Sequence, residues 1–181
     1  PSETTLFRYG KVGIRRKKLK DLVEEDAKEP ALTKDGQTFQ LFANADTPEE
    51  VNAAIESACE GVGLFRTEAL FLRKNEMPTE EVQFLHYREL VEAAKPLAVT
   101  IRTLDLGGDK VLNQGDREQE NNPFMGFRAI RYCLQNPDIF LLQLRAILRA
   151  SAFGNVKLMF PMISGVGEVI RAKVLLERAK N

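Results

Sequence analysis

The sequence predicts an α/β protein, and three observations support this fold class. Short apolar runs typical of buried strands alternate along the chain with longer segments of helical periodicity. Two of the apolar runs, residues 61–65 and 97–101, pass directly into charged residues. The composition is that of an ordinary globular chain, with 181 residues, 44% hydrophobic residues and a formal net charge of zero. This alternation requires parallel strands joined by right-handed crossovers.

The first part of the chain predicts an amphipathic helix. Residues 8–20 are strongly basic, the following residues are acidic, and apolar residues are interspersed in both parts until Pro30 ends the segment. Mixed charges of this kind fit the solvated surface of a helix better than a patch that binds nucleic acid. We therefore expect no nucleic-acid partner.

Turn and cap residues mark the elements that follow. Thr47 can cap a helix that begins at Pro48, Asn136 and Pro137 start another, and Gly154 closes it. The expected elements are a strand at 38–43, a helix from 48, a strand at 61–65, a helix at 80–94, a strand at 97–101, a helical region after 126, a helix from 137, a strand at 156–159 and a helix at 168–180.

Residues 97–110 predict a ligand-binding edge. A dry strand leads into Arg102, Asp105, two glycines and Lys110. In parallel α/β folds ligands bind at the carboxyl ends of the strands. A guanidinium can hold two oxygens of an anion at once, and glycines let backbone N–H groups approach it, so these residues suit a phosphate. An ordinary salt-bridged loop explains the same residues equally well.

The long segment 107–126 has no periodicity, and segments of this length are usually binding loops or disordered. Two architectures accept the order of elements, a small doubly wound sheet or part of a (βα)8 barrel. The doubly wound sheet lacks a glycine-rich nucleotide loop after its first strand. A complete barrel needs about 250 residues. The chain supplies about four βα units, so a barrel here would be a half.

The cysteines and the histidine indicate no separate chemistry. Cys59 and Cys133 have no metal-binding spacing, and we expect both to be small buried hydrophobes in a reducing, cytosolic protein. His86, the one histidine, lies within a helix and is expected to pack or to face the solvent. No apolar stretch is long enough for a membrane span, so we expect no membrane partner.

Six motifs resemble one family, in the order in which that family has them. They closely resemble the phosphoenolpyruvate-utilising barrel of enzyme I of the bacterial phosphotransferase system, a phosphoenolpyruvate-protein phosphotransferase. The motifs are GVGLFRTEALF (61–71), PTEEVQF (78–84), TIRTLDLGGDK (100–110), ENNPFMGFRAIR (120–131), QLRAILRASAFG (143–154) and MFPMI (159–163).

The resemblance implies a partial (βα)8 TIM barrel of about four βα units preceded by a linker helix. It divides the chain into a linker helix region, residues 1–33, and the first half of the barrel domain, residues 34–181. The implied reaction moves the phosphoryl group of phosphoenolpyruvate to an enzyme histidine and on to a small phosphocarrier protein, with Mg²⁺, for sugar uptake in the bacterial cytoplasm. A nitrogen-system paralogue, phosphoenolpyruvate synthase and pyruvate phosphate dikinase are alternatives.

The resemblance also implies roles for particular residues. Arg66 and Arg102 match the arginines that hold the phosphoryl group of phosphoenolpyruvate, and Lys110 and Arg128 match supporting cations. Asn44, expected at the end of the first strand, faces the same edge of the sheet and is a further candidate. In phosphoryl transfer the protein positions and neutralises spread negative charge, which is work for such cations.

The resemblance also bears on two carboxylates and on the family's functional residues that this chain does not contain. Glu68 and Asp105 either orient these arginines or form structural salt bridges. The family's Mg²⁺ ligands, its general-acid cysteine and its phosphorylated histidine lie outside this chain, and neither Cys59, Cys133 nor His86 matches them. We therefore expect no catalytic or metal residue and no turnover from this chain alone. A phosphate-binding module and a self-associating half-barrel are the alternatives for the chain by itself.

Overall fold

The structure, a computed structural model, describes residues 29–57, 59–72, 77–107 and 126–181, and these confirm the α/β class. Strands and helices alternate along the described residues. The elements are β1 (Ala43–Ala45), α2 (Pro48–Glu56), β2 (Gly61–Phe65), α3 (Glu68–Leu72), α4 (Glu80–Ala93), β3 (Ala98–Arg102), α5 (Ile130–Gln135), α6 (Pro137–Ser151), β4 (Asn155–Met159) and α7 (Val166–Lys180).

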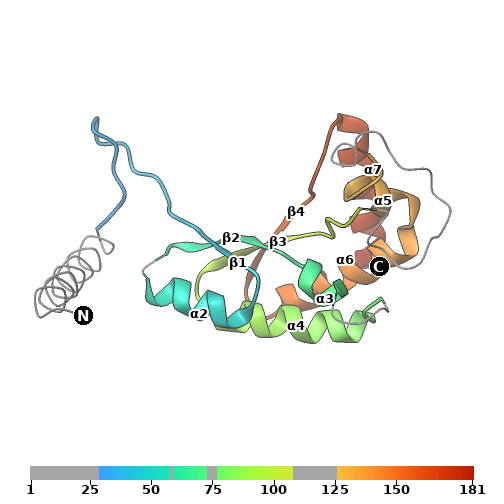
Figure 1. Cartoon of the computed structure of the whole chain (residues 1–181), viewed down its shortest axis with the longest axis horizontal. Helices are drawn as coiled ribbons and strands as arrows, with labels where there is room; N and C mark the ends of the chain where they lie inside the picture. The colour runs from blue at the N-terminus through green and yellow to red at the C-terminus, as the bar shows by residue number, and fades with distance from the viewer. Residues whose placement is uncertain (1–28, 58, 73–76, 108–125) are drawn as a thin grey trace, which may run out of the picture.

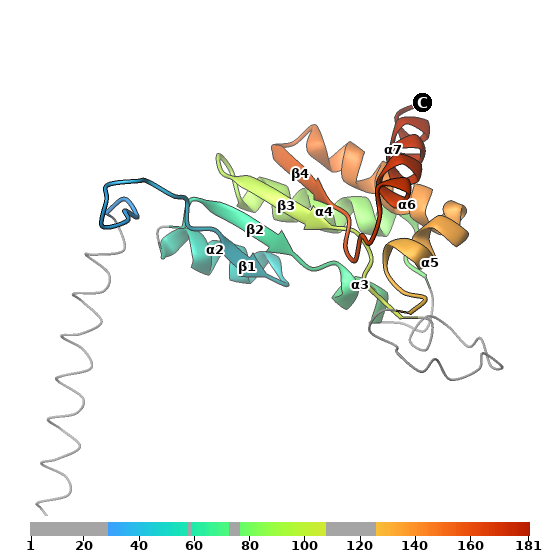
Figure 2. The same cartoon turned by 90° about the horizontal axis from the view of Figure 1, so that it is seen from above.

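The four strands form one parallel sheet in the order β1-β2-β3-β4 (Figure 2). Each new strand is added on the same side of the previous one, as in the wall of a barrel, whereas a doubly wound sheet reverses direction. Helices α2, α4 and α6 lie along one face of this sheet, and α5 and α7 lie beyond the carboxyl ends of β3 and β4 (Figure 1). The structure therefore confirms the expected partial (βα)8 barrel.

The core lies in two clusters of buried side chains. The first fills the space between the sheet and the helices α2, α4 and α6, and the second joins α5, α6 and α7 to the loop after β3. The first includes Val62, Phe65, Tyr87, Leu90, Val99, Ile101 and Ile147, and the second includes Leu104, Leu106, Ile130, Cys133, Phe140 and Leu144.

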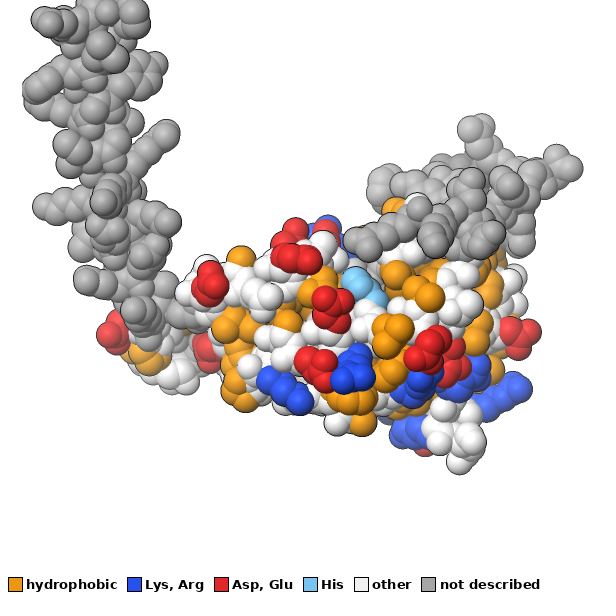
Figure 3. Space-filling model, turned by 90° about the horizontal axis from the view of Figure 1, so that it is seen from below, with side chains coloured by type: hydrophobic (Ala, Val, Ile, Leu, Met, Phe, Trp, Pro, Cys, Tyr) orange, Lys and Arg blue, Asp and Glu red, His pale blue; other side chains and the backbone are white. Residues whose placement is uncertain are grey.

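Helices α4 and α6 pack against each other, and ion pairs mark the outer edge of their contact. Arg145 Nε lies 2.6 Å from Glu80 Oε2, and Arg149 bridges Glu80 and Glu81. The hydrogen bond from Arg145 is the main reason that the pKa of Glu80 lies below its ordinary value. Positive and negative side chains lie side by side among hydrophobic ones on this outer surface (Figure 3).

The opposite face of the sheet, which we call the inner face, carries an aromatic ring near the amino ends of the strands. A Cβ atom at Gly63 would lie 2.8 Å from Phe42 Cβ, and one at Gly61 would lie 2.9 Å from Phe42 Cε1. Lys157 of β4 places its Nζ 5.6 Å from the centroid of the same ring. The two glycines of β2 thus make room for the Phe42 ring on the inner face.

The prediction of a strand at residues 38–43 is wrong, because β1 covers only Ala43–Ala45. The neighbouring strand β2 starts at Gly61, so among the described residues no strand lies beside those before Leu41. Their backbone pairs with the preceding turn instead, as in the hydrogen bond from Phe39 N to Ala31 O. Asn44 consequently lies within β1 and not after it.

Other expectations meet the structure in part. Thr47 caps α2 through its side chain, as predicted, and Thr79 caps α4 in the same way. The sequence does not predict the five-residue helix α3. The expected leader helix and most of the proposed region 1–33 lie outside the described residues, so the division at residue 33 stays a prediction. No described helix is both long and apolar enough to cross a membrane.

Gly154, in the turn between α6 and β4, offers a test of this packing. A Cβ atom there would lie 2.7 Å from Cγ1 of Val91, a side chain 1% exposed, and 3.3 Å from its carbonyl oxygen. We expect Gly154→Ala to lower the free energy of unfolding in urea by about 1–3 kcal/mol, because a packed core cannot absorb the added methyl group.

Gly167 in the first turn of α7 is the matched control, because a Cβ atom there would have no other atom within 4 Å among the described residues. Gly167→Ala should leave the free energy of unfolding unchanged or raise it by about 0.5–1 kcal/mol, the helix preference of alanine over glycine. Equal effects of the two substitutions would contradict the packing described here.

Candidate functional site

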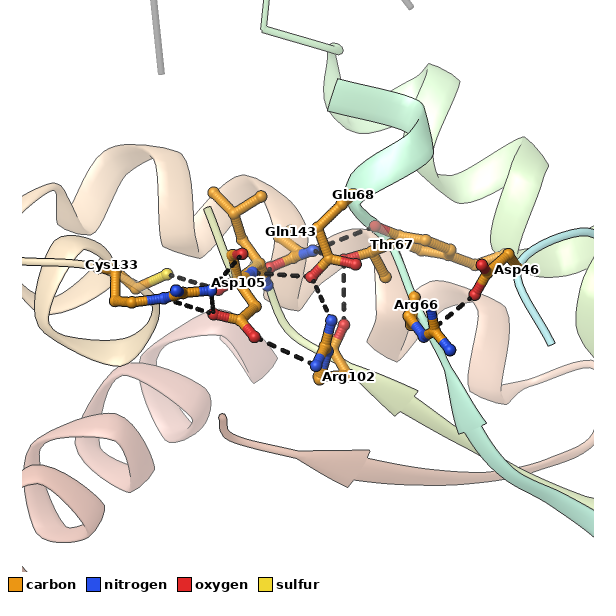
Figure 4. A network of polar contacts seen from close by, with 11 residues as sticks. Asp46, Arg66, Thr67, Glu68, Arg102, Asp105, Cys133 and Gln143 are labelled. Atoms are coloured by element: carbon orange, nitrogen blue, oxygen red, sulfur yellow. Dashed lines mark hydrogen bonds and ion pairs between the residues drawn. The ribbon is translucent and has the colours of Figure 1, made fainter. Parts of the chain in front are cut away.

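Charged side chains collect at the carboxyl edge of the sheet, where the four parallel strands end. Asp46 follows β1, Arg66 follows β2 and Arg102 is the last residue of β3. Parallel strands bring their carboxyl ends to one edge, so residues far apart in the sequence meet there. Figure 4 shows these side chains in a row above the ends of β2 and β3.

Arg102 is the most buried of the arginines described at this edge, with 18% of its side chain exposed. Its Nη2 donates to Glu68 Oε1 at 3.0 Å, and its Nη1 lies 3.1 Å from Asp105 Oδ2. Within the described part of the chain, the buried Nε of Arg102 and Oε2 of Glu68 have no hydrogen-bond partner. The guanidinium is therefore held at its two terminal nitrogens, while its Nε has no partner among the described residues.

Asp105 links Arg102 to a second cation. Its Oδ1 accepts from Arg128 Nη2 at 2.9 Å and from Nε at 3.2 Å, while its own backbone N–H donates to Glu68 Oε1 at 3.0 Å. The backbone of Arg128 forms an antiparallel bridge with Gly107, and the next residue, Ala129, has a φ of 52°. Non-glycine residues adopt such a φ at a cost in energy, which is typical of functional loops.

Arg66 differs from Arg102 in exposure. Its side chain is 47% exposed, and its Nε lies 3.3 Å from Asp46 Oδ1. Asp46 occupies the position directly after β1 that the sequence pattern assigns to Asn44, because β1 starts and ends later than predicted. Asn44 is exposed and lies two residues before Asp46. Arg66 therefore presents a solvated cation beside the buried one.

The carboxylates expected to orient the arginines do contact them, Glu68 and Asp105 on Arg102 and Asp105 on Arg128. Lys110 and residues 108–125 of the long segment lie outside the described residues. Three arginines and three carboxylates form this cluster, so their formal charges cancel; the six residues are Arg66, Arg102, Arg128, Asp46, Glu68 and Asp105.

Further polar residues at this edge are not predicted from the sequence. Thr67 and Gln143 are each 1% exposed and hydrogen-bonded to one another at 3.3 Å. The sequence feature that could have indicated Gln143 is the placement of a glutamine within the mostly apolar run LLQLRAIL of α6. Arg131 also contributes, since its Nε lies 3.4 Å from Glu168 Oε1 and its Nη1 donates to the Gly126 carbonyl. It connects the start of α5 to the start of α7.

Cys133 and His86 pack among other side chains as expected, whereas Cys59 is less buried than expected. Burial raises the pKa of the Cys133 thiol to about 12, so the group stays protonated. Cys59 is a free, half-buried thiol. The His86 ring lies 5.8 Å from the Phe65 ring, on the helical side of the sheet. Among the described residues there is no group of three or more His, Cys, Asp or Glu side chains suited to a metal ion.

Comparison with known proteins identifies the family of this chain. A family model described as "PEP-utilising enzyme, PEP-binding domain" matches residues 20–181. The chain is 49% identical over 150 residues to the phosphoenolpyruvate-protein phosphotransferase of Staphylococcus carnosus, covering 83% of this chain and 26% of the relative. It is 45% identical over 182 residues to that of Priestia megaterium, covering 99% and 32%.

The corresponding protein of Bacillus subtilis is 47% identical over 152 residues, which cover 84% of this chain and 27% of the relative. The chain thus spans between about a quarter and a third of the length of these relatives. Because the family match extends over nearly the whole chain, this protein belongs to the PEP-utilising enzymes and carries their PEP-binding domain.

Proposed function

We propose that this chain forms part of the phosphoenolpyruvate site of a phosphoenolpyruvate-protein phosphotransferase, with Arg66 and Arg102 holding the phosphoryl group. One observation carries the proposal. The two arginines lie at the carboxyl ends of adjacent parallel strands, and Arg102 is fixed by two carboxylates while its buried Nε has no partner among the described residues. The names of the relatives support the choice of ligand.

This geometry suits phosphoryl transfer, in which a protein contributes mainly by positioning and by stabilising charge on the phosphoryl oxygens. A guanidinium held by Glu68 and Asp105 does not have to reorganise when the anion arrives. Arg66 adds a second, solvated donor group beside it. Together they would grip the phosphoryl oxygens from two strands.

The balanced charges of the cluster imply that more positive charge is needed for a phosphate. Arg128, already in the cluster, together with Lys110 and the polar Asn44, are the proposed supporting residues. Mg²⁺ is the proposed metal of the reaction. The described residues do not fit a metal site, because their carboxylates at this edge are engaged with arginines and no group of three potential ligands occurs among them.

The rest of the reaction is proposed from the relatives. The phosphoryl group would pass to an enzyme histidine and then to a phosphocarrier protein, serving sugar uptake, in the cytoplasm, where free thiols such as Cys59 and Cys133 persist. The alternatives are a nitrogen-system paralogue, phosphoenolpyruvate synthase and pyruvate phosphate dikinase, which would use the same pair of arginines for the phosphoryl group. The proposed division is a linker helix region at 1–33 and a barrel part at 34–181.

By itself this chain should show no phosphotransfer from phosphoenolpyruvate. Its one histidine, His86, packs against the Phe65 ring, and the described residues offer no metal site. A phosphotransfer assay on the purified chain, with and without Mg²⁺, checks this. Turnover would contradict it.

Phosphoenolpyruvate binding should depend on both arginines. We expect Arg66→Ala and Arg102→Ala each to weaken binding about 10- to 100-fold, because each removes charge-assisted hydrogen bonds worth about 1.5–3 kcal/mol. Calorimetric titration of phosphoenolpyruvate into the chain, with and without Mg²⁺, measures the dissociation constants.

Arg88→Ala is the matched control, since Arg88 pairs with Glu92 on the surface of α4 and should leave binding unchanged. If the wild-type chain binds phosphoenolpyruvate and both site variants bind it equally well, the proposed role of Arg66 and Arg102 is contradicted. Equal losses in all three variants would indicate a general effect of net charge.

We also propose that two copies of this chain associate. Within the described residues β1 pairs only with β2 and β4 only with β3, which leaves two strand edges open. Two four-stranded sheets supply the eight strands of a closed barrel. Helix α7 adds an exposed apolar stripe of Val166, Ile170 and Val174, which are 75%, 58% and 62% exposed. A second copy would cover the edges and the stripe together.

The sedimentation of the chain tests this proposal. We expect a dimer of the 20.4 kDa chain, and Ile170→Glu should shift it to monomer because a charge would enter the apolar stripe. Arg171→Glu, a charge reversal at an exposed position about 100° around the same helix from Ile170, should leave the dimer intact. A compact wild-type monomer would refute the association.

A further inference from the structure

One buried side-chain amide, that of Gln143, contacts the segments that follow β2 and β3. Gln143 belongs to α6 and is 1% exposed. Its Oε1 accepts from the backbone N–H of Leu104 at 2.9 Å, and its Nε2 donates to Thr67 Oγ1 at 3.3 Å and to Tyr87 OH at 3.2 Å. All the hydrogen-bonding groups of this amide point at the carboxyl edge or at α4, as Figure 4 shows for Gln143 and Thr67.

Thr67 extends the contact to β3. It lies between Arg66 and Glu68, is 1% exposed, and donates its hydroxyl proton to the carbonyl oxygen of Arg102 at 3.0 Å. Gln143 therefore contacts the loop after β2 through Thr67, and the loop after β3 directly at Leu104. Both loops are tied to one side chain of α6.

The directions of these hydrogen bonds leave one orientation for the amide. Tyr87 OH donates to Gln83 Oε1 at 3.3 Å, so the phenol oxygen accepts from Gln143. The hydroxyl of Thr67 likewise donates onward and accepts from Gln143. Turning the amide over would set its NH2 group against the N–H of Leu104, two donors face to face. The hydrogen bonds to Leu104, Thr67 and Tyr87 thus fix the orientation of the Gln143 amide.

The anchored groups are neighbours of the charged ones. Thr67 lies between Arg66 and Glu68, and Leu104 directly precedes Asp105, the second carboxylate on Arg102. A displacement of either loop would change the distance between the two guanidinium groups. Misplacement of binding groups by about 1 Å is enough to cost large factors in binding or rate.

We infer that Gln143, acting through Thr67 and Leu104, is a positioning residue that sets the spacing of Arg66 and Arg102 for a phosphoryl group. The inference rests on the proposed function of these arginines. Gln143 and Thr67 are each 1% exposed, so they act through the backbone from which the side chains of Arg66 and Arg102 project.

Isosteric substitutions separate positioning from packing. Thr67→Val keeps the shape of the side chain but removes the hydroxyl, whereas Thr67→Ser keeps the hydroxyl. Gln143→Met removes the amide at similar volume. Ile147→Ala is the control for stability, because Ile147 lies one turn further along α6, is 3% exposed, and packs in the adjoining hydrophobic cluster.

Titration of phosphoenolpyruvate into these variants, with melting temperatures measured alongside, gives the first readout. We expect Thr67→Val and Gln143→Met to bind about tenfold more weakly than the wild type. Thr67→Ser should stay within about threefold. Ile147→Ala should bind as the wild type although its melting temperature falls. Unchanged binding in Thr67→Val or Gln143→Met would overturn the inference, as would an equal loss in Ile147→Ala.

A second readout needs no ligand, so it separates this inference from the proposed function. The Nε–H resonance of Arg102 in ¹⁵N NMR spectra should be sharp in the wild type, in Thr67→Ser and in Ile147→Ala, and broadened in Thr67→Val and Gln143→Met. Failure of the wild type to bind phosphoenolpyruvate would count against the proposed function, and the resonance would still decide on positioning. A resonance that is the same in all five proteins would overturn the inference.

Discussion

A positive charge buried at the end of β3 determines much of the surrounding structure. The Arg102 side chain is only 18% exposed, and a charge removed from water to this degree needs opposite charges and hydrogen bonds close by. Glu68 arrives from the loop after β2, and Asp105 from the loop after β3 itself. Because Asp105 also binds Arg128, the segment before α5 is drawn to the same place. Three separate parts of the chain thus meet around the ion pair of Arg102 and Asp105.

The α/β class of the fold beneath this cluster follows from the alternation of strands and helices. The alternation leaves a doubly wound sheet and a partial barrel open, and the family resemblance favours the barrel. The two apolar runs that end in Arg66 and Arg102 form β2 and β3 within one residue of their expected bounds. The first strand is misplaced because a strand needs a neighbour, and the local run TFQLFA gives no information on where β2 begins. Helix α3 is only five residues long, too short for periodicity to reveal.

The charged residues of the site can be predicted as a group, but not their pairings. Arg66, Arg102, Glu68 and Asp105 follow strands, and that position alone indicates the carboxyl edge. Which carboxylate meets which arginine depends on three-dimensional register, as in the contact between Arg102 and Glu68 across 34 residues of sequence. Gln143 lies 39 residues from Leu104 in sequence, and helical periodicity marks its position only as buried. Buried polar contacts of this range are visible only in the folded chain.

The ring of Phe42 gives the sheet two unlike ends. Packed over Gly61 and Gly63 and close to the ammonium group of Lys157, it occupies the inner face near the amino ends of the strands. The opposite ends of the same strands carry the guanidinium groups. The sheet therefore carries an aromatic side chain, 40% exposed, where β2 begins, and charged side chains where β2 and β3 end. The first residues of β2 thus contribute packing, whereas Arg66, directly after β2, and Arg102, at the end of β3, contribute charge.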